Sequence, residues 1–505
     1  MKLTRILSIS LAVLMIVALV GCGGSKRQPI ELTLSTEDSA AILNAAGIRL
    51  PDASEAAGAG TTVKWCAHYD PFQNYSEDEI VNTGFYTFKE KYGGSLEHVE
   101  VEFGERWNEL SRLLLSNNAP DLFPGETAIF PNYVMKGMFA PVNNYIDFDD
   151  PLWAEMKDYA YTYFGLAGNV YAAVISADYG HVVPYNRRVI NEWGFDDPAE
   201  LYANDQWTWD KFYEMCLDFS DPDEDRYALD GWYFSASFYD SVGQSLVPLD
   251  TETGKFYSNL DYPGFERAAQ YLYDLNKNDC TYPWWNSWSC RDNSANGAGV
   301  KDGKCLFWIV APWGFTDTLA NNALTWGDIP TEFMFVPLPR DPQGDGKYYI
   351  TSSPLAYCII NGAENPEGAA LIITCERFKA LDPVVKAIDE KQLRETYGWT
   401  DEMIEMNKIC LELANTGSPI VNYNDGYGNY LNEIVGNDGK IAASGHPTSR
   451  DAGMSWAQLK ETYKDRVGVL VDELNADIEK FIANGGAVDR DSLAADVAEE
   501  GEATE

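Results

Sequence analysis

Positive charge is scarce in this sequence. Among its 505 residues, 37 are Lys or Arg and 78 are Asp or Glu, so the formal net charge is −41. Neutralising a nucleic-acid backbone requires a broad basic surface, which this composition does not supply. We therefore exclude nucleic acid as a partner and expect a strongly hydrated, soluble surface.

The sequence also lacks the short motifs that mark common catalytic and metal sites. It contains no nucleophile elbow, no HExxH motif, no P-loop and no CxxC or Cys/His cluster with zinc spacing. Asp221, Asp223 and Asp225 begin like a calcium loop. Arg226, however, stands at the position of the loop glycine, and Trp232 at that of the bidentate acid. The sequence therefore favours a protein without catalysis, cofactor or metal.

No apolar run is long enough to be a clear membrane span. The run at residues 6–20 follows Lys2 and Arg5, is short, and has the flanks of an export signal. It ends in LVGC, which is similar to the lipobox of bacterial lipoproteins. We expect residues 1–21 to be removed and Cys22 to be diacylated, which would anchor the protein to the outer face of the bacterial cytoplasmic membrane. An ordinary signal with a chance cysteine is the alternative.

Cysteines are few outside the signal. Apart from Cys22 there are eight, and Cys305, Cys358 and Cys375 lie inside apolar runs, where a free cysteine behaves as a small hydrophobic residue. Cys280 and a second cysteine ten positions later share one loop-like segment, DCTYPWWNSWSC. A disulfide between Cys280 and Cys290 is therefore possible, and the sequence leaves the bonded and free states open.

The length and pattern of the mature chain indicate more than one α/β unit. A chain of 505 residues is too long for one ordinary core, and strands alternate with helices. Apolar spacing predicts helices at 105–115, after Thr208, and from 456 to 481. Composition predicts a lipidated flexible tether at 22–61, in which residues 31–48 could hold a short helix, and an acidic disordered tail at 485–505.

Seven segments, in this order, resemble one known family. They are RWNELSRLLLSNNAPDLF, GMFAPVNNYI, GNVYAAVISADYGHVVPYNRRVINEWGF, WTWDKF, DGKCLFWIVAPWG, FVPLP and AYCIINGAENPEGAALIITC. The family is the extracellular solute-binding proteins of family 1, sugar-binding lipoproteins of ABC importers that include maltodextrin-binding protein. The resemblance runs from about Trp65 to about Phe481.

The resemblance implies an α/β, periplasmic-binding-protein-like fold of type II, with two lobes and a ligand cleft between them. We expect the first lobe at 62–178 and 355–410 and the second at 179–354 and 411–484. Crossovers are then expected near 176–180, 351–354 and 410–421. The hinge position is less defined, because residues 172–174 read Ala-Ala-Val where the family often has glycine and proline. Extra segments lie near 284–299 and 383–400.

The stretch DGKCLFWIVAPWGF suggests where a sugar would bind. Trp308 lies within a continuous apolar run and is expected in the core. Trp313 follows Pro312 at the end of that strand, where open α/β sheets present their ligand crevice, and its ring can stack on a pyranose. Packing of this ring between helix and sheet is the alternative. The same logic gives further candidates for ligand contact, and for each of them a packed ring or a solvated loop is the alternative. They are His68, Tyr69, Asp70, Glu126, Asp178, Tyr179, Trp232, Tyr423 and Tyr427.

The resemblance implies a monomeric lipoprotein that closes on a carbohydrate, most simply an oligosaccharide, and delivers it to the permease of an ABC transporter. Two alternatives stay open. A secreted carbohydrate-active hydrolase would use a carboxylate pair, and 78 acidic residues make chance pairs unavoidable. A surface lipoprotein that senses sugar or mediates adhesion would bind without delivering.

Overall fold

The computed structural model describes residues 35–503 except 57–61, 75–79, 232–233, 284–297, 317–318, 418, 448 and 450. The predictions for Cys22, Trp232 and Cys290 therefore lie outside the described residues. Among the residues that are described, no helix is both long and apolar enough to cross a membrane.

A seven-stranded sheet forms the core of one half of the molecule, which we call the first lobe. Its main order is β15-β14-β3-β1-β2, with β4 and β7 also paired to β14. β1 runs parallel to β2 and β3, whereas β14 runs antiparallel to β3 and β7. The strands are β1 (Thr62–Ala67), β2 (Ser95–Glu100), β3 (Leu122–Gly125), β4 (Phe139–Ala140), β7 (Ala173–Tyr179), β14 (Ile350–Ile360) and β15 (Pro419–Ile420).

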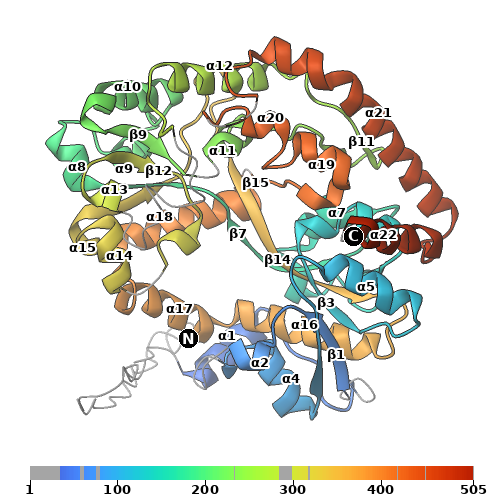
Figure 1. The fold of residues 1–505 in the computed structure, drawn as a ribbon. Coiled ribbons are helices and arrows are strands. Elements are labelled where there is room, and N and C mark those ends of the chain that lie inside the picture. Colours follow the sequence, from blue (N-terminus) through green and yellow to red (C-terminus); the bar gives the residue numbers. More distant parts are fainter. Residues whose placement is uncertain are drawn as a thin grey trace.

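A four-stranded sheet forms the core of the second lobe, in the order β13-β8-β12-β9. β12 and β9 are parallel. All four residues of β12 are buried, as the continuous apolar run predicts. The strands are β8 (Val183–Asn186), β9 (Tyr227–Asp230), β12 (Cys305–Trp308) and β13 (Phe333–Val336). In Figure 1 the two sheets lie in separate halves, and β7 and β14 pass between them, so the predicted two-lobed α/β fold is confirmed.

Helices cover both sheets. Those on or beside the first sheet are α4 (Gly84–Tyr92), α5 (Arg106–Leu115), α6 (Asn132–Met135), α7 (Lys157–Phe164), α16 (Pro366–Leu381) and α17 (Pro383–Glu395). Those of the second lobe include α8 (Arg187–Glu192), α9 (Pro198–Ala203), α10 (Trp209–Phe219), α11 (Phe234–Asp240), α12 (Pro263–Lys277), α14 (Leu319–Trp326), α15 (Ile329–Glu332), α19 (Asn429–Val435) and α20 (Lys440–Ala443).

The three helices predicted from apolar spacing are present. α5 buries Trp107, Leu110 and Leu114 on one face. α10 starts after Thr208, whose hydroxyl accepts a hydrogen bond from the amide of Lys211 and so caps the helix. The stripe near the end of the chain is α21 (Trp456–Ala483), which begins with a capping box formed by its N-cap serine.

The predicted tether and the predicted tail each contain a packed helix. In the predicted tether, α1 (Thr36–Ala45) buries Leu43, and the hydroxyl of Ser39 donates to Asp382 at 2.5 Å. In the predicted tail, α22 (Arg490–Ala503) buries Leu493 completely and contacts α5. The helix in the tether agrees with the short helix that its sequence allows, whereas the tail is helical where disorder was expected. Composition averages over a segment, whereas one well-placed leucine suffices to dock a short helix.

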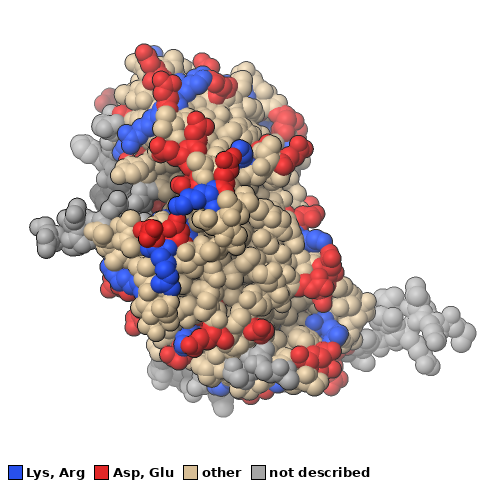
Figure 2. All heavy atoms as spheres, turned by 90° about the vertical axis from the view of Figure 1, so that its right-hand side faces the viewer, with Lys and Arg blue, Asp and Glu red and all other residues tan. Residues whose placement is uncertain are grey.

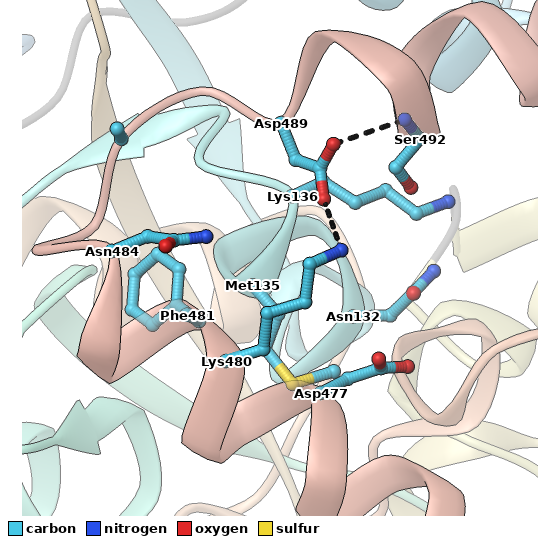
Figure 3. A pocket seen from close by; sticks show the side chains of 10 residues that line it. Asn132, Met135, Lys136, Asp477, Lys480, Phe481, Asn484, Asp489 and Ser492 are labelled. Atoms are coloured by element: carbon cyan, nitrogen blue, oxygen red, sulfur yellow. Dashed lines mark hydrogen bonds and ion pairs between the residues drawn. The ribbon is translucent and has the colours of Figure 1, made fainter.

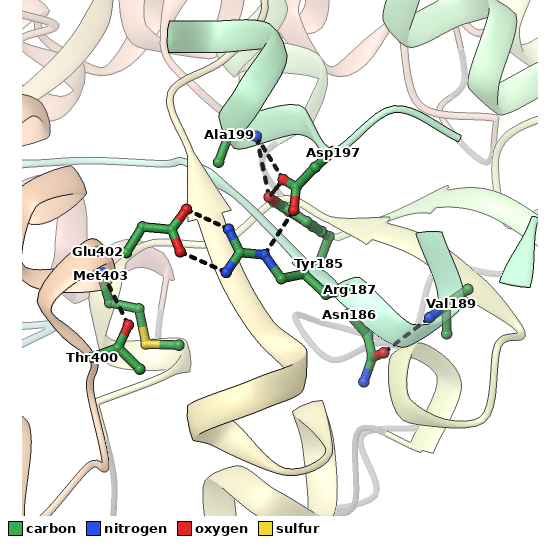
Figure 4. Close-up of polar contacts among 9 residues, drawn as sticks. All are labelled: Tyr185, Asn186, Arg187, Val189, Asp197, Ala199, Thr400, Glu402 and Met403. Carbon is green, nitrogen blue, oxygen red and sulfur yellow. Dashed lines mark hydrogen bonds and ion pairs between the residues drawn. The ribbon is translucent and has the colours of Figure 1, made fainter. Parts of the chain in front are cut away.

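Helix α18 (Asp401–Glu412) contacts the second lobe, although the predicted boundary places it in the first. Figure 4 shows the guanidinium of Arg187, from α8, held between Asp197 and Glu402. Its Nε lies 2.7 Å from Asp197, and its Nη1 lies 2.7 Å from Glu402. Trp399, just before α18, packs 5.3 Å from Phe335 of β13 between ring centroids. These contacts attach α18 to the second sheet.

Charged side chains of both signs are interspersed on the side of the molecule that carries α21. Figure 2 shows Lys and Arg next to Asp and Glu on this face, with no continuous basic area among the described residues in view. This face is therefore polar and of mixed charge.

Candidate ligand-binding site

Trp313 is a large, exposed ring at the end of a buried strand. It lies in the 3₁₀-helix η5 (Pro312–Gly314), which follows β12, and its side chain is 47% exposed. Trp308, five residues earlier, is buried and stacks on Trp326 with ring centroids 5.2 Å apart. The two tryptophans thus have different roles: Trp308 packs the core as predicted, whereas Trp313 offers a ring face to solvent.

The neighbouring strand β9 ends beside β12. Asp230 pairs with Trp308 in the parallel register. Gly231 has φ of 117°, and a Cβ atom there would lie 2.5 Å from the carbonyl oxygen of Ile309. Only glycine fits this close approach. Gly231 therefore lies against the segment that leads from β12 to Trp313, at the carboxyl edge where α/β sheets bind ligands.

In the first lobe, the residues after β1 form a cluster of rings. The indole Nε1 of Trp65 donates to the carbonyl oxygen of Tyr69 at 2.8 Å and fixes the turn that contains His68, Tyr69 and Asp70. His68 is exposed, and its ring centroid lies 5.0 Å from those of both Tyr69 and Phe103. Phe103 is 53% exposed. The candidate residues of this turn thus lie next to Phe103, an exposed ring that the sequence did not single out.

Arg106, the first residue of α5, connects this ring cluster to Glu126. Its guanidinium carbon lies 4.0 Å from the ring centroid of Phe103. Its Nη2 lies 3.3 Å from Glu126 and 3.9 Å from Asp425. The Arg106 side chain is only 7% exposed, and its Nε is buried without a hydrogen-bond partner among the described residues. An arginine this deeply buried normally has all its donors satisfied.

The two carboxylates beside Arg106 remain accessible. The side chain of Glu126 is 38% exposed and that of Asp425 is 52% exposed. Glu126 follows β3, and Asp425 lies in the 3₁₀-helix η7 (Asn424–Tyr427), which packs against the residues after Glu126. The cluster thus combines a forked donor, two acceptors and an exposed ring, which together suit hydroxyl groups that both donate and accept.

At the crossover, Asp178 and Tyr179 differ in exposure. Asp178 is exposed to solvent, yet desolvation by the surrounding protein raises its carboxyl pKa. Tyr179 is buried, and its hydroxyl donates to Asn407 at 2.7 Å. Asp178 is accordingly available to a ligand, whereas Tyr179 is a packing residue.

Tyr423 and Tyr427 are also packing residues. They are 3% and 5% exposed. The hydroxyl of Tyr423 donates to the carbonyl oxygen of Tyr163, and that of Tyr427 to the carbonyl oxygen of Val247, each at 2.9 Å. Both rings are buried in this arrangement, which corresponds to the packed alternative for these two positions. The turn η7 buries these two tyrosines and exposes Asp425 between them.

The segment that begins like a calcium loop contains an internal ion pair. The guanidinium of Arg226 lies 3.1 Å from the carboxylate of Asp221, whose other oxygen accepts from the amide of Asp223. Within the described ranges, no group of three metal-ligating side chains occurs. Cys280, for which the sequence left the bonded and free states open, is a buried free thiol, and Cys290 lies outside the described residues.

The molecule has two α/β lobes, and in each of them exposed rings and polar side chains follow the ends of parallel strands. These features define a ligand-binding protein of the two-lobed class. The chain belongs to the bacterial extracellular solute-binding proteins, because the family model of that description matches residues 85–375. It is therefore an extracellular binding protein. No curated protein sequence matches the chain.

Several solved structures share this fold. The galacto-N-biose-/lacto-N-biose I-binding protein of an ABC transporter from Bifidobacterium longum, in complex with lacto-N-biose, is 14% identical with a TM-score of 0.56, covering 83% of this chain and 98% of that chain. The cyclic alpha-maltosyl-1,6-maltose binding protein from Arthrobacter globiformis is 14% identical with a TM-score of 0.56, covering 82% and 99%. A solute-binding protein from Thermotoga lettingae, bound to alpha-D-tagatose, is 17% identical with a TM-score of 0.52, covering 81% and 99%.

Proposed function

We propose that this protein binds a carbohydrate, an oligosaccharide in particular, between its two lobes and delivers it to the permease of an ABC transporter. The observation that carries the proposal is the exposed ring of Trp313 at the carboxyl edge of the second sheet, which is suited to stack on a sugar. The carbohydrates bound by the structurally similar proteins from Bifidobacterium, Arthrobacter and Thermotoga support the same ligand class.

The cluster around Arg106 supports a neutral sugar rather than an acidic one. One guanidinium faces two carboxylates, Glu126 and Asp425, so the group carries a net negative charge. A uronic acid or sulfated sugar would be repelled there. Hydroxyl groups, in contrast, can accept from the arginine fork and donate to the carboxylates.

We further propose that the protein is attached to the membrane through a lipid on Cys22. The described structure starts with α1 docked on the first lobe, so the connecting chain comprises only residues 22–34. Thirteen residues span at most about 45 Å. An anchor of this length would keep the binding lobes close to a permease in the same membrane.

A glycan screen tests binding and catalysis together. The chain without its signal, carrying Cys22→Ser, is heated with each member of a panel of neutral and acidic glycans. A bound glycan should raise the midpoint of unfolding, because ligand at 100 times Kd adds about 2.7 kcal/mol to the free energy of unfolding. The same glycan should be recovered intact after long incubation.

The controls separate the possibilities. Trp313→Ala should lose most of the ligand-induced shift while it still folds. Conversion of the glycan to shorter products would identify a hydrolase instead. If acidic glycans alone stabilise the protein, the assignment of the Arg106 cluster to a neutral sugar is wrong.

A further inference from the structure

Helix α21 is the longest helix among the described residues, and its N-terminal half is fixed to the second lobe. Its 28 residues correspond to about 42 Å at 1.5 Å per residue. Trp456 packs on Phe265 of α12, with ring centroids 6.0 Å apart. Lys460 and Lys464 both donate to Asp261, at 2.6 and 2.5 Å.

The C-terminal end of the same helix lies against the first lobe. Phe481 packs edge-on against Tyr171, with ring centroids 5.9 Å apart. Gly485 and Gly486 then turn the chain with φ of 66° and 75°, a conformation that glycine adopts without strain. The side-chain amide of Asn361, which directly follows β14, donates to the carbonyl oxygen of Gly486 at 3.4 Å.

Figure 3 shows the junction between α21, α6 and α22. The carboxylate of Asp489 accepts from Nζ of Lys480 at 2.8 Å and from the amide of Ser492 at 3.1 Å, which caps the start of α22. The amide of Asp489 donates to the carbonyl oxygen of Lys136, at the end of α6. The junction is thus hydrogen-bonded to the backbone of the first lobe.

Helix α22 is docked along α5. The guanidinium of Arg490 donates to the carbonyl oxygen of Leu115 at 3.0 Å and to the side chain of Asn117 at 2.6 Å. Leu493 is fully buried. In Figure 1, α21 descends along one side of the molecule from the second lobe, and α22 ends beside α5 of the first lobe.

We propose that α21 and α22 together form a strap, residues 456–503, that holds the two lobes in the described arrangement and opposes their separation. The chain passes between the lobes at β7, at β14 and in the segment around α18, and the strap is a fourth connection. Because both of its ends are packed, a rotation that separates the lobes on this side breaks the contacts at one end.

The strap also acts on the helix that carries the candidate site. α22 packs on α5, and Arg106 is the first residue of α5. A protein held near its ligand-competent arrangement loses less free energy on binding, since the apparent Kd equals the intrinsic Kd divided by the competent fraction. This consequence for affinity rests on the proposed sugar-binding function, whereas the restraint on lobe separation does not.

Small-angle X-ray scattering of the ligand-free protein tests the restraint. Two variants remove the part of the first-lobe attachment that α22 makes: a chain shortened after Gly486, and the full-length chain with Leu493→Asp. The matched control is Val469→Asp, at a position of α21 that is 57% exposed. A compact chain of this size has a radius of gyration of about 23 Å. We expect both attachment variants to exceed the radius of the unchanged protein, and the control to match it.

Circular dichroism of each variant accompanies the scattering. A folded shortened chain with an unchanged radius of gyration would overturn the proposal. So would a shortened chain that unfolds, because a strap laid over two complete lobes should leave each lobe intact when it is removed.

Calorimetric titration of the same variants with a glycan found in the screen tests the consequence for binding. If the competent fraction falls to about a tenth, Kd rises about tenfold. An expanded shortened chain with unchanged Kd would overturn the link between the strap and the site. Failure of every glycan to bind the unchanged protein would instead contradict the proposed function and leave the scattering result standing.

Discussion

Asp240 offers a test of how burial affects stability in this fold. It is the last residue of α11, is 9% exposed, and accepts a hydrogen bond from the hydroxyl of Thr351 at 2.9 Å. Thr351 lies in β14, and its carbonyl oxygen accepts from the amide of Gly180 in the crossover. Burial raises the pKa of Asp240 from 3.8 to about 7, and the Thr351 hydrogen bond offsets only part of that rise.

The sign of the pH dependence follows from this pKa. Below pH 3.8 the carboxyl group is protonated in both the folded and the unfolded protein. Between pH 3.8 and about 7 the unfolded chain is ionised while the buried carboxyl group of the folded protein stays protonated, so stability falls across this interval and changes little above it. The difference between the two pKa values corresponds to about 4 kcal/mol in total, of which about 2.5 kcal/mol is lost between pH 5 and pH 8.

Asp240→Asn removes the ionisation and keeps an acceptor for Thr351. We expect its free energy of unfolding, relative to the unchanged protein, to increase by about 2.5 kcal/mol from pH 5 to pH 8. Urea denaturation of both proteins at several pH values measures this difference, in which other titrations cancel. Asp218→Asn, at an exposed position of α10, should show a constant difference. A constant difference for Asp240→Asn as well would refute the reasoning.

Three further predictions concern the site and the anchor. Trp313→Ala should weaken glycan binding by roughly 2 to 4 kcal/mol, or about 30- to 1000-fold in Kd, with stability less affected; calorimetric titration and denaturation of the same variant separate the two effects. Arg106→Lys keeps the charge but loses the guanidinium fork, so titration should show Kd raised by about tenfold or more. Cys22→Ala should move the protein from the membrane fraction to the medium in a bacterial host, and an unchanged membrane fraction would exclude the lipid anchor.

Local patterns predicted much of the fold. The buried run of β12, the apolar face of α5 and the cap of α10 by Thr208 each depend on residues within a few positions of one another. The same holds for the contrast between Trp308 and Trp313, because a strand end and a following proline are visible in the sequence. Interactions between residues that lie a few positions apart in the sequence can be inferred without a structure.

The parts that were missed depend on contacts across the chain. Arg106 meets Asp425 although the two residues lie in distant parts of the sequence, and no local pattern distinguishes it from a solvated helix residue. Tyr423 and Tyr427 could not be separated from exposed rings, because the segment VNYNDGYGNY is polar throughout. Helix α22 has a weak apolar face, and only the surface of α5 gives Leu493 a place to pack.

The cysteines have a practical consequence. Seven of them, Cys66, Cys216, Cys280, Cys305, Cys358, Cys375 and Cys410, are buried and free. Burial raises the pKa of Cys66 to about 12 and that of Cys280 to about 11, so their thiolate forms are scarce at neutral pH. With Cys22 and Cys290 replaced by serine, a single cysteine introduced beside Trp313 would be the main thiol open to a fluorophore. The molecule would then serve as a scaffold for an optical sensor of its own ligand.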